Sequence, residues 1–360
     1  MFKKTVLLLT GLSLIGLIVW FSQGGSEVIF KEKPVKISKS ELYTGEVLWP
    51  KSEEDKDAAG EASGVAVNSK GDIYYFHRAD GEYSGEDYIE EPTIVVLDGE
   101  TKEVKRTWGE GLFKSPHGLE IDSKDNIWMT DVSLNKVFKF SPEGELIQTF
   151  GTDYNPGTEV SLRIRNALPN FPVLMDEYTF ARPTDVTVME DGSFAVSDGY
   201  RNRRIAKFDR NGKLEWQVNN LGNQPGELNL PHGISSDSEG TIYVADRNNS
   251  RIQLFDKKGN YLDHWDMSEI GRPFGVEAGT DGKIYVVDGG DYLNGAEENL
   301  TSQVIILDNK GKILDRFGDW GNKEGQMKIP HDIAVDENGD LYVAELKNMR
   351  LHYFKQSAVE

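Results

Sequence analysis

The chain has 360 residues, enough for one large domain or two ordinary ones with a sizeable hydrophobic core. Its formal net charge of −20 argues against a nucleic-acid partner or an anionic membrane surface, because both require clusters of Lys and Arg. The sequence contains no Cys, which excludes disulfides and thiolate metal sites, so any metal must be held by His and carboxylates.

The N-terminal stretch predicts an export segment. Two lysines precede an uncharged run over residues 5–26, which is the order of charged start and apolar centre in a signal peptide. The run is also long enough to span a bilayer, and no Ala occurs before Ala58 to form an A-x-A cleavage site. Residues 1–26 are therefore expected to be a signal peptide or a membrane anchor that exports the rest of the chain. Residues 27–42 are polar and are interpreted as a tether.

A repeated phrase follows and predicts the fold. Each copy has runs of Val, Ile, Tyr and Phe separated by Asp-Gly, Glu-Gly or Asn-Gly turns, which are strand and hairpin signals. Four antiparallel strands repeated six times are typical of a β-propeller, and no long stretch has the periodicity of a helix. The sequence therefore predicts an all-β, six-bladed β-propeller over residues 43–360. The six copies begin at Ala62, Pro116, Pro183, Pro231, Pro273 and Pro330.

The ends of the repeat array predict how the ring closes. The sixth copy lacks a fourth strand, whereas residues 43–49 form a strand-like run without a blade of their own. We expect this N-terminal strand to complete the last blade, because closure removes a free sheet edge. Insertions interrupt the array near residues 79–92, 152–182 and 290–302. The first and third follow the second strand of their copies, so both are expected on one face, where they could shape a site.

Alignment of the copies predicts a metal site on the propeller axis. One repeat position is His117, His232 and His331 in copies two, four and six. Alternate blades of a six-bladed ring are a third of a turn apart, so three imidazoles at one level converge on the axis. Such a site suits zinc, with a fourth position open for water or substrate, although other first-row divalent ions are possible. The alternative is that Pro-His-Gly is a strand-start turn whose His caps backbone groups.

The next repeat position carries a carboxylate in copies three and six, Asp185 and Asp332. A carboxylate there would point into the narrow centre of the disc. Asp332 directly follows a proposed ligand and could bind a harder cation such as calcium, together with backbone carbonyls of neighbouring inner strands. The alternatives for Asp332 are an Asx turn or a partner that orients a histidine.

A second set of aligned positions lies at the end of the second strand of each copy. Five copies have an acid there, which indicates a structural role, and His77 takes the place in the first copy as a packing histidine. One residue further, Arg78 in copy one and Arg247 in copy four lie opposite each other across the ring. Two guanidinium groups that face one cavity suit a carboxylate ligand, and Tyr200 of copy three could reach the same opening. The alternative for each arginine is a surface ion pair.

Together these residues resemble the peptidyl-α-hydroxyglycine α-amidating lyase family, also called peptidylamidoglycolate lyases, built from NHL repeats. The similarity covers about residues 45–355, in the motifs FHRAD, PHGLEID, RPTDV, SDGYRNRRI, LPHG, ADRNNSRI and IPHDIAV. The resemblance implies zinc as a cofactor at His117, His232 and His331. It implies calcium at Asp332 with the main-chain carbonyls of Val65 and Leu119. It also implies Arg78, Tyr200 and Arg247 as the catalytic residues.

The resemblance further implies the reaction: cleavage of the N–Cα bond of a C-terminal α-hydroxyglycine to give an amide and glyoxylate. The expected partner is a small-molecule or peptide substrate bearing a carboxylate, and the expected protein is a monomer that meets a membrane only through its N-terminal segment. Two alternatives remain open. One is a non-catalytic NHL scaffold that binds a protein or cell-envelope ligand. The other is a different propeller hydrolase, such as a lactonase, although those usually hold calcium through carboxylate and Asn ligands.

Overall fold

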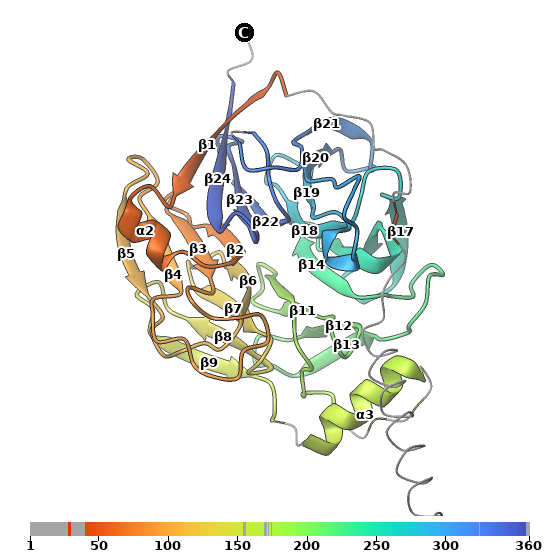
Figure 1. The fold of residues 1–360 in the computed structure, drawn as a ribbon. Coiled ribbons are helices and arrows are strands. Elements are labelled where there is room, and N and C mark those ends of the chain that lie inside the picture. Colours follow the sequence, from red (N-terminus) through yellow and green to blue (C-terminus); the bar gives the residue numbers. More distant parts are fainter. Residues whose placement is uncertain are drawn as a thin grey trace, which may run out of the picture.

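The computed structural model describes residues 28–29, 40–153, 156–168, 171, 173, 175–323 and 325–357. Six antiparallel sheets of four strands surround a central axis, which confirms the predicted all-β, six-bladed propeller (Figure 1). The predicted signal or anchor segment, residues 1–26, lies outside the described residues. Within the described ranges, no helix has the length and apolar character needed to cross a membrane.

Five blades are meanders whose first strand lies at the axis and whose fourth strand lies at the rim. Blade 1 contains β2 (Ala62–Val67), β3 (Ile73–His77), β4 (Ile94–Leu97) and β5 (Val104–Trp108). Blade 2 contains β6 (Pro116–Ile121), β7 (Ile127–Asp131), β8 (Lys136–Phe140) and β9 (Leu146–Phe150). Blade 3 contains β10 (Asp185–Val188), β11 (Phe194–Asp198), β12 (Arg204–Phe208) and β13 (Leu214–Val218).

The chain continues around the ring in the same way. Blade 4 contains β14 (Pro231–Ser236), β15 (Ile242–Asp246), β16 (Arg251–Phe255) and β17 (Tyr261–Asp266). Blade 5 contains β18 (Pro273–Ala278), β19 (Ile284–Asp288), β20 (Gln303–Leu307) and β21 (Ile313–Phe317). Blade 6 contains β22 (Pro330–Val335), β23 (Leu341–Glu345), β24 (Arg350–Gln356) and, from the other end of the chain, β1 (Tyr43–Trp49).

Strand β1 is the rim strand of the last blade and pairs antiparallel with β24, from Tyr43 opposite Gln356 to Trp49 opposite Leu351. It also contacts the first blade, because the Trp49 ring lies 5.2 Å from the Tyr75 ring. Trp49 is buried and belongs to an apolar cluster shared by the sixth and first blades. The strand therefore closes the ring by hydrogen bonds to one blade and by packing against the next.

The hydrophobic core is divided into six clusters, and each fills the gap between two adjacent blades. Between blades 1 and 2, for example, the ring of Phe76 meets the ring of Phe113 edge to face at 4.9 Å. Between blades 2 and 3, Trp128 packs 4.9 Å from Phe194. Alternating strand residues supply these clusters from both faces of each sheet, so the strands are apolar on both sides.

Helices are few and lie outside the blades. The sequence predicts none, but the second insertion contains α3 (Pro156–Ala167), which projects from the rim (Figure 1). Among its described side chains only Leu162 is buried, so the apolar stripe that would reveal a helix in the sequence is absent. The other helices among the described residues are α2 (Glu53–Ala58), η1 (Arg247–Asn249) and η2 (Tyr292–Asn294).

All three insertions emerge on one face of the disc. The start of an inner strand pairs with the end of the second strand, as Ala62 does with His77 and Pro116 with Asp131. The first and third insertions follow second strands, and the second insertion precedes an inner strand. We call this side the insertion face; it is the face on which each inner strand begins.

Ring closure by β1 makes a truncation prediction. A chain that starts at residue 40 is expected to unfold cooperatively. A chain that starts at residue 51 should lose a sharp transition in calorimetry, because it exposes the edge of β24 and removes the buried Trp49. In the longer chain, Trp49→Ala should lower the free energy of unfolding by about 3–5 kcal/mol. A sharp transition at unchanged Tm for the shorter chain would contradict the role given to β1.

Candidate metal centre and surrounding site

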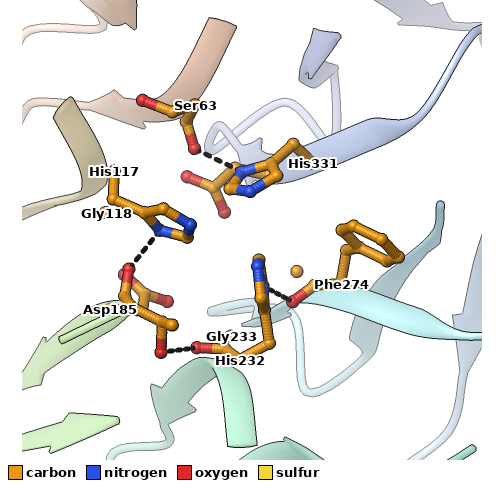
Figure 2. Close-up of a pocket in the computed structure, with 11 residues that line it drawn as sticks. Ser63, His117, Gly118, Asp185, His232, Gly233, Phe274 and His331 are labelled. Atoms are coloured by element: carbon orange, nitrogen blue, oxygen red, sulfur yellow. Dashed lines mark hydrogen bonds between the residues drawn. The ribbon is translucent and has the colours of Figure 1, made fainter. Parts of the chain in front are cut away.

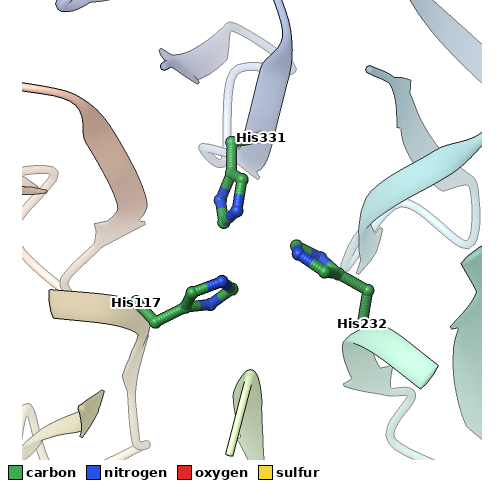
Figure 3. Close-up of side chains that lie close together, drawn as sticks. All are labelled: His117, His232 and His331. Carbon is green, nitrogen blue, oxygen red and sulfur yellow. The ribbon is translucent and has the colours of Figure 1, made fainter. Parts of the chain in front are cut away.

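Each of the three aligned histidines lies inside a β-bulge at the start of its inner strand. The preceding Pro is the first residue of the strand, where a missing N–H costs no ladder hydrogen bond. A bulge re-aims the side chain it contains, and here all three imidazoles turn towards the axis (Figure 3). The pairing register shifts between Pro116 and Leu119, between Pro231 and Ile234, and between Pro330 and Asp332.

The backbone just before two of these strands is strained. Leu230 and Ile329 precede the prolines of blades 4 and 6, and their φ values are 62° and 54°. A left-handed conformation is unfavourable for residues other than Gly and most unfavourable for a β-branched residue such as Ile329. Such strain persists only where surrounding structure fixes it, and it is concentrated at functional sites.

The three imidazoles form one compact, buried cluster. The His117 ring lies 4.9 Å from the His232 ring and 4.6 Å from the His331 ring, and the last two are 4.7 Å apart. Within the part of the chain that the structure describes, they are the only three His, Cys, Asp or Glu residues whose potential ligand atoms all lie within 4.8 Å of one another. They can hold a metal ion.

Hydrogen bonds between blades orient all three rings (Figure 2). In each case Nδ1 lies close to the backbone carbonyl at the aligned position of the next blade. A carbonyl can only accept, so Nδ1 carries the proton and the lone pair of Nε2 is left for the axis. This is the tautomer that a metal-binding histidine needs, with its second nitrogen already fixed by a partner. The pairs are His117 with Thr184 at 2.6 Å, His232 with Phe274 at 2.9 Å, and His331 with Ser63 at 2.7 Å.

Electrostatics keep these imidazoles neutral. Burial lowers the pKa of His117 and His232 well below the usual value, and neighbouring histidines and arginines lower both further. Burial and the charge of Arg78 lower the pKa of His331 to about 3. At neutral pH all three rings are therefore uncharged, with a proton on Nδ1 only, and able to donate their Nε2 lone pairs to a cation. The residues fit a tris-histidine metal centre.

The cavity on the axis has the size of an ion. It has a volume of about 10 Å³ and is lined by the three histidines, the aligned residues of the other three blades and the residues that follow them. A space of this size holds one water-sized species and no organic ligand. A substrate would therefore have to approach the centre from the insertion face.

Tyr200 is the side chain that touches this centre from the insertion face. Its Oη lies 2.9 Å from Nε2 of His117 and 3.2 Å from Nε2 of His232. The loop that carries Tyr200 is anchored to α3, because Arg165 of that helix donates to the carbonyl of Arg201 at 2.9 Å. Burial raises the pKa of Tyr200 above its usual value, and Tyr83 acts in the same direction. The positive charges of Arg247 and Arg78 lower the pKa of Tyr200, but burial has the largest effect on it.

Arg247 is a buried cation without an anionic partner. Its guanidinium lies over the Phe274 ring, 4.0 Å from the centroid. No side-chain hydrogen bond or ion pair joins its guanidinium to another described residue, and its buried Nε has no acceptor among them. An unsatisfied buried charge is costly, so this position suits an acceptor that the described residues do not provide.

Arg78 lies on the opposite side of the centre and is partly satisfied. Its Nη1 donates to Glu61 at 2.6 Å, while its buried Nε has no acceptor among the described residues. The Phe274 ring beneath the Arg247 guanidinium lies 5.1 Å from the His232 ring, and the Tyr83 ring beside Arg78 packs against Tyr200. Both guanidinium groups also lower the pKa of His331 and of His232. The structure thus brings together around one centre the residues that the sequence singled out. They are His117, His232, His331, Tyr200, Arg78 and Arg247.

Asp332 lies deeper on the axis, away from the insertion face. Its carboxylate accepts hydrogen bonds from the backbone N–H groups of Val65 and Ile333, both at 2.9 Å. Asp185, on the opposite blade, makes the same kind of bond to the N–H of Ile234 at 3.0 Å. Burial raises the pKa of Asp332 to about 7. Val65 thus contacts Asp332 through its backbone N–H. Leu119 occupies the position in β6 that aligns with Val65 in β2.

Two further acids on the axis, Glu120 and Glu277, were missed in the sequence. They occupy the same position of blades 2 and 5, two residues beyond the Asp position, and strand alternation points both to the same side. Burial and the nearby Asp332 raise the pKa of Glu277 to about 8. Burial, Glu277, Asp185 and Asp332 raise the pKa of Glu120. The four carboxylates therefore lie close enough on the axis to influence one another, and a hard cation there would relieve their repulsion.

The acids at the ends of the second strands have the structural role expected of them. Asp131 accepts from the N–H groups of Lys114 and Ser115, both at 2.8 Å, and so fixes the segment that leads into β6. Asp246 binds the N–H of Asn229 at 2.7 Å in the same way. His77 is a packing residue, buried 5.0 Å from the Trp49 ring.

The fold and the site together define an NHL-type β-propeller with a buried tris-histidine centre at its insertion face. The NHL repeat family matches residues 228–255 and 328–354. A gluconolactonase of Xanthomonas campestris has the same fold, with a TM-score of 0.58 over 92% of this chain and 97% of that structure, at 13% identity.

Curated relatives identify the family. Peptidyl-alpha-hydroxyglycine alpha-amidating lyase 2 of Drosophila melanogaster is 30% identical over 324 residues, which cover 83% of this chain and 71% of the relative. The chain belongs to the peptidyl-α-hydroxyglycine α-amidating lyase family. It is also 33% identical over 335 residues to peptidyl-glycine alpha-amidating monooxygenase B of Xenopus laevis, covering 86% of this chain. It spans only 36% of that longer relative.

The tris-histidine geometry predicts the metal content of variants. Wild-type protein is expected to bind about one zinc ion per chain, and His117→Ala, His232→Ala or His331→Ala should each reduce it to below about 0.1. Plasma emission spectrometry after dialysis measures this directly. His264→Ala is the matched control, because His264 is exposed and bonded to Tyr261 at the rim. Full zinc content in a variant lacking all three axial histidines would contradict the assignment.

The axial carboxylates predict a pH-dependent stability. Glu277 has a pKa of about 8 in the folded chain against 4.5 for a free side chain, so between these values the folded chain retains a proton that the unfolded chain has released. Stability in chelator should therefore fall as pH rises from about 4.5 to 8. At pH 8.5, Glu277→Gln should raise Tm by about 3 °C.

The same melting experiment at pH 4.5 should show no gain for Glu277→Gln. Calcium at pH 8.5 should raise the Tm of wild type more than that of the variant, since it offsets a repulsion that the variant has already lost. Glu239→Gln, at an exposed hairpin turn, is the matched control and should leave the profile unchanged. A wild-type profile that rises across this range would show that the buried carboxylates do not hold protons.

Proposed function

We propose that this protein is a metal-dependent carbon–nitrogen lyase, which cleaves the N–Cα bond of a C-terminal α-hydroxyglycine to give an amide and glyoxylate. Family membership supports a lyase in general, since the Drosophila relative bears that name. The observation that carries the finer proposal is the pairing of a buried tris-histidine centre with Arg247, a buried cation that lacks an anion. An α-hydroxyglycine supplies both missing groups, a hydroxyl and a carboxylate.

The substrate carboxylate would bind Arg247 and the free Nε side of Arg78. Both guanidinium groups adjoin residues that contact the histidine cluster, so a carboxylate held there would leave the adjacent carbon, with its hydroxyl, close to Nε2 of the histidines. Planar guanidinium groups bind carboxylates through two parallel N–H bonds, which fixes the orientation of the bound group. A zinc ion held by the three Nε2 atoms would supply Lewis acidity that lowers the pKa of the substrate hydroxyl.

Tyr200 is proposed as the proton carrier. Its Oη already contacts two of the three histidines, so a substrate hydroxyl bound at the centre would lie within its reach. It would take the hydroxyl proton as the C–N bond breaks and the C–O bond becomes a carbonyl, and it would give that proton to the departing amide nitrogen. No water is consumed. Ionisation of Tyr200 requires that positive charge outweigh the effect of burial, and Arg247 and Arg78 act in that direction.

The remaining expectations extend this proposal. We assign calcium to the axial channel at Asp332, with Val65 and Leu119 as carbonyl ligands, since the channel concentrates carboxylates with raised pKa values. The proposed location is outside the cytoplasm, with residues 1–26 as a signal or anchor and residues 27–42 as a tether. The proposed partner is a peptide or small acyl amide, bound by a monomer.

The two alternatives are weaker on the same observations. A scaffold that only binds another protein needs neither a neutral tris-histidine cluster nor an unpaired guanidinium beside it. A lactonase-like hydrolase usually centres calcium on carboxylates and Asn, whereas the catalytic face of this axis is lined by imidazoles. Likeness to a gluconolactonase at 13% identity concerns the fold and does not distinguish these functions.

Activity measurements test the proposal with zinc-loaded protein, α-hydroxyhippurate as the substrate and glyoxylate as the readout. Wild type should release glyoxylate, and Tyr200→Phe should lower kcat by about 10²-fold or more if Tyr200 carries the proton. Arg247→Lys should not preserve activity, because an ammonium group cannot reproduce the planar pair of donors.

Matched controls are Tyr261→Phe and Arg106→Lys, which alter the same residue types on rim strands. Both should retain wild-type kcat/KM. If wild-type protein with confirmed zinc releases no more glyoxylate than His232→Ala, a non-catalytic NHL scaffold becomes the better interpretation.

A further inference from the structure

We propose that Tyr83 is a specificity-determining residue, whose ring binds the side chain that precedes the hydroxyglycine and favours an aromatic group there. This inference rests on the proposed function for the position of the scissile bond. It specifies which class of substrate the site prefers. The observation that supports it is that the partly exposed Tyr83 ring contacts two proposed catalytic residues, Arg78 and Tyr200, from the solvent side.

The contacts of Tyr83 place it at the mouth of the site. The Arg78 guanidinium carbon lies 5.3 Å from the centroid of the Tyr83 ring. The Tyr200 ring meets the same ring edge to face at 5.5 Å. Tyr83 is 43% exposed, whereas Arg78 is 2% and Arg247 is 5% exposed. Tyr83 therefore connects the buried arginine and tyrosine of the site with solvent.

The first insertion, residues 79–92, is held in place by residues that lead into blades 2 and 3. Arg182, which leads into blade 3, donates to Ser84 Oγ at 2.6 Å. The N–H of Ser84 donates to Ser115 Oγ of blade 2 at 3.1 Å, and the N–H of the buried Ile89 donates to the carbonyl of Phe113 at 2.9 Å. A pinned loop holds the Tyr83 ring in position before a substrate arrives, which lowers the entropic cost of using it for binding.

The direction of the substrate then follows from the buried groups. With the carboxylate at the arginines and the hydroxyl at the histidines, the acyl part of the substrate has to extend towards the insertion face. The first ring that it meets there is Tyr83, because this ring adjoins both Arg78 and Tyr200. Aromatic rings bind other flat or apolar groups through offset or edge-to-face contacts, which add affinity beyond the buried area.

The experiment separates binding from turnover by using peptides that cannot react. N-acetyl-Phe-Gly and N-acetyl-Gly-Gly lack the hydroxyl, and their dissociation constants are measured by calorimetry on the zinc-loaded, full-length protein. Wild type should bind the Phe peptide about tenfold more tightly. Tyr83→Ala should reduce this preference to below about twofold, and Tyr83→Phe should retain it because the ring remains.

Tyr88→Ala provides the matched control. Tyr88 lies in the same loop and is 49% exposed, but its ring contacts Lys114 instead of the catalytic residues. This variant should keep the tenfold preference. Equal binding of the two peptides by wild type, or loss of the preference in Tyr88→Ala as well as in Tyr83→Ala, would overturn the proposal.

Turnover of the hydroxylated forms of both peptides distinguishes the two hypotheses. The preference in kcat/KM should match the preference in binding and should disappear in Tyr83→Ala through KM rather than kcat. If wild type releases no glyoxylate from either peptide, the proposed function fails, even where the binding preference persists. If glyoxylate is released from both at equal kcat/KM and binding is also equal, the function stands and the role of Tyr83 falls.

Discussion

The hydrogen bond from each axial imidazole to the carbonyl of the next blade is the interaction on which the site depends. One neutral hydrogen bond contributes only about 1 kcal/mol to stability, but these three determine which nitrogen of each ring faces the axis. They also join blade 2 to 3, blade 4 to 5, and blade 6 to 1. The bond from His331 to Ser63 crosses the seam that β1 closes, so ring closure and metal-site geometry are not independent.

A propeller repeats one strand pattern in every blade, and this repetition explains which features could be predicted from the sequence. Six copies of one strand pattern specify the fold, and an aligned position in an inner strand becomes a radial position around the axis. His117, His232 and His331 could therefore be brought together before any coordinates were known. The same alignment, continued two residues further, would have revealed Glu120 and Glu277 in opposite blades. They were missed because an acid in only two copies stands out less than an alternating histidine.

Other features could not be read from the repeats. The Nδ1 partners are the backbone carbonyls of Thr184, Phe274 and Ser63, and a backbone carbonyl leaves no mark on side-chain identity. The helix α3 arises in an insertion, outside the periodic pattern, and buries little of its own surface. Its effect on the site is indirect, through the bond of Arg165 to the loop that carries Tyr200. Contacts of this kind depend on the packing of one particular chain.

Basic and acidic side chains lie at opposite ends of the propeller axis. On the insertion face lie two guanidinium groups, of which Arg247 has no anionic partner among the described residues. Further along the inner strands lie four carboxylates with raised pKa values, and the neutral histidines separate the two groups. In the proposed function, the anionic substrate binds at the arginine end of the axis and the hard cation at the carboxylate end.

This arrangement also separates chemistry from selectivity. The histidines, Asp332 and the acids of the second strands are fixed by strand pairing and by bonds between blades, so their geometry tolerates little change. Tyr83 stands on a loop whose anchors, Arg182 and Ser115, lie outside the metal centre. A substitution in that loop can alter which acyl group is bound while the three imidazoles keep their partners. Substrate preference within such a scaffold can therefore change without a change in the reaction.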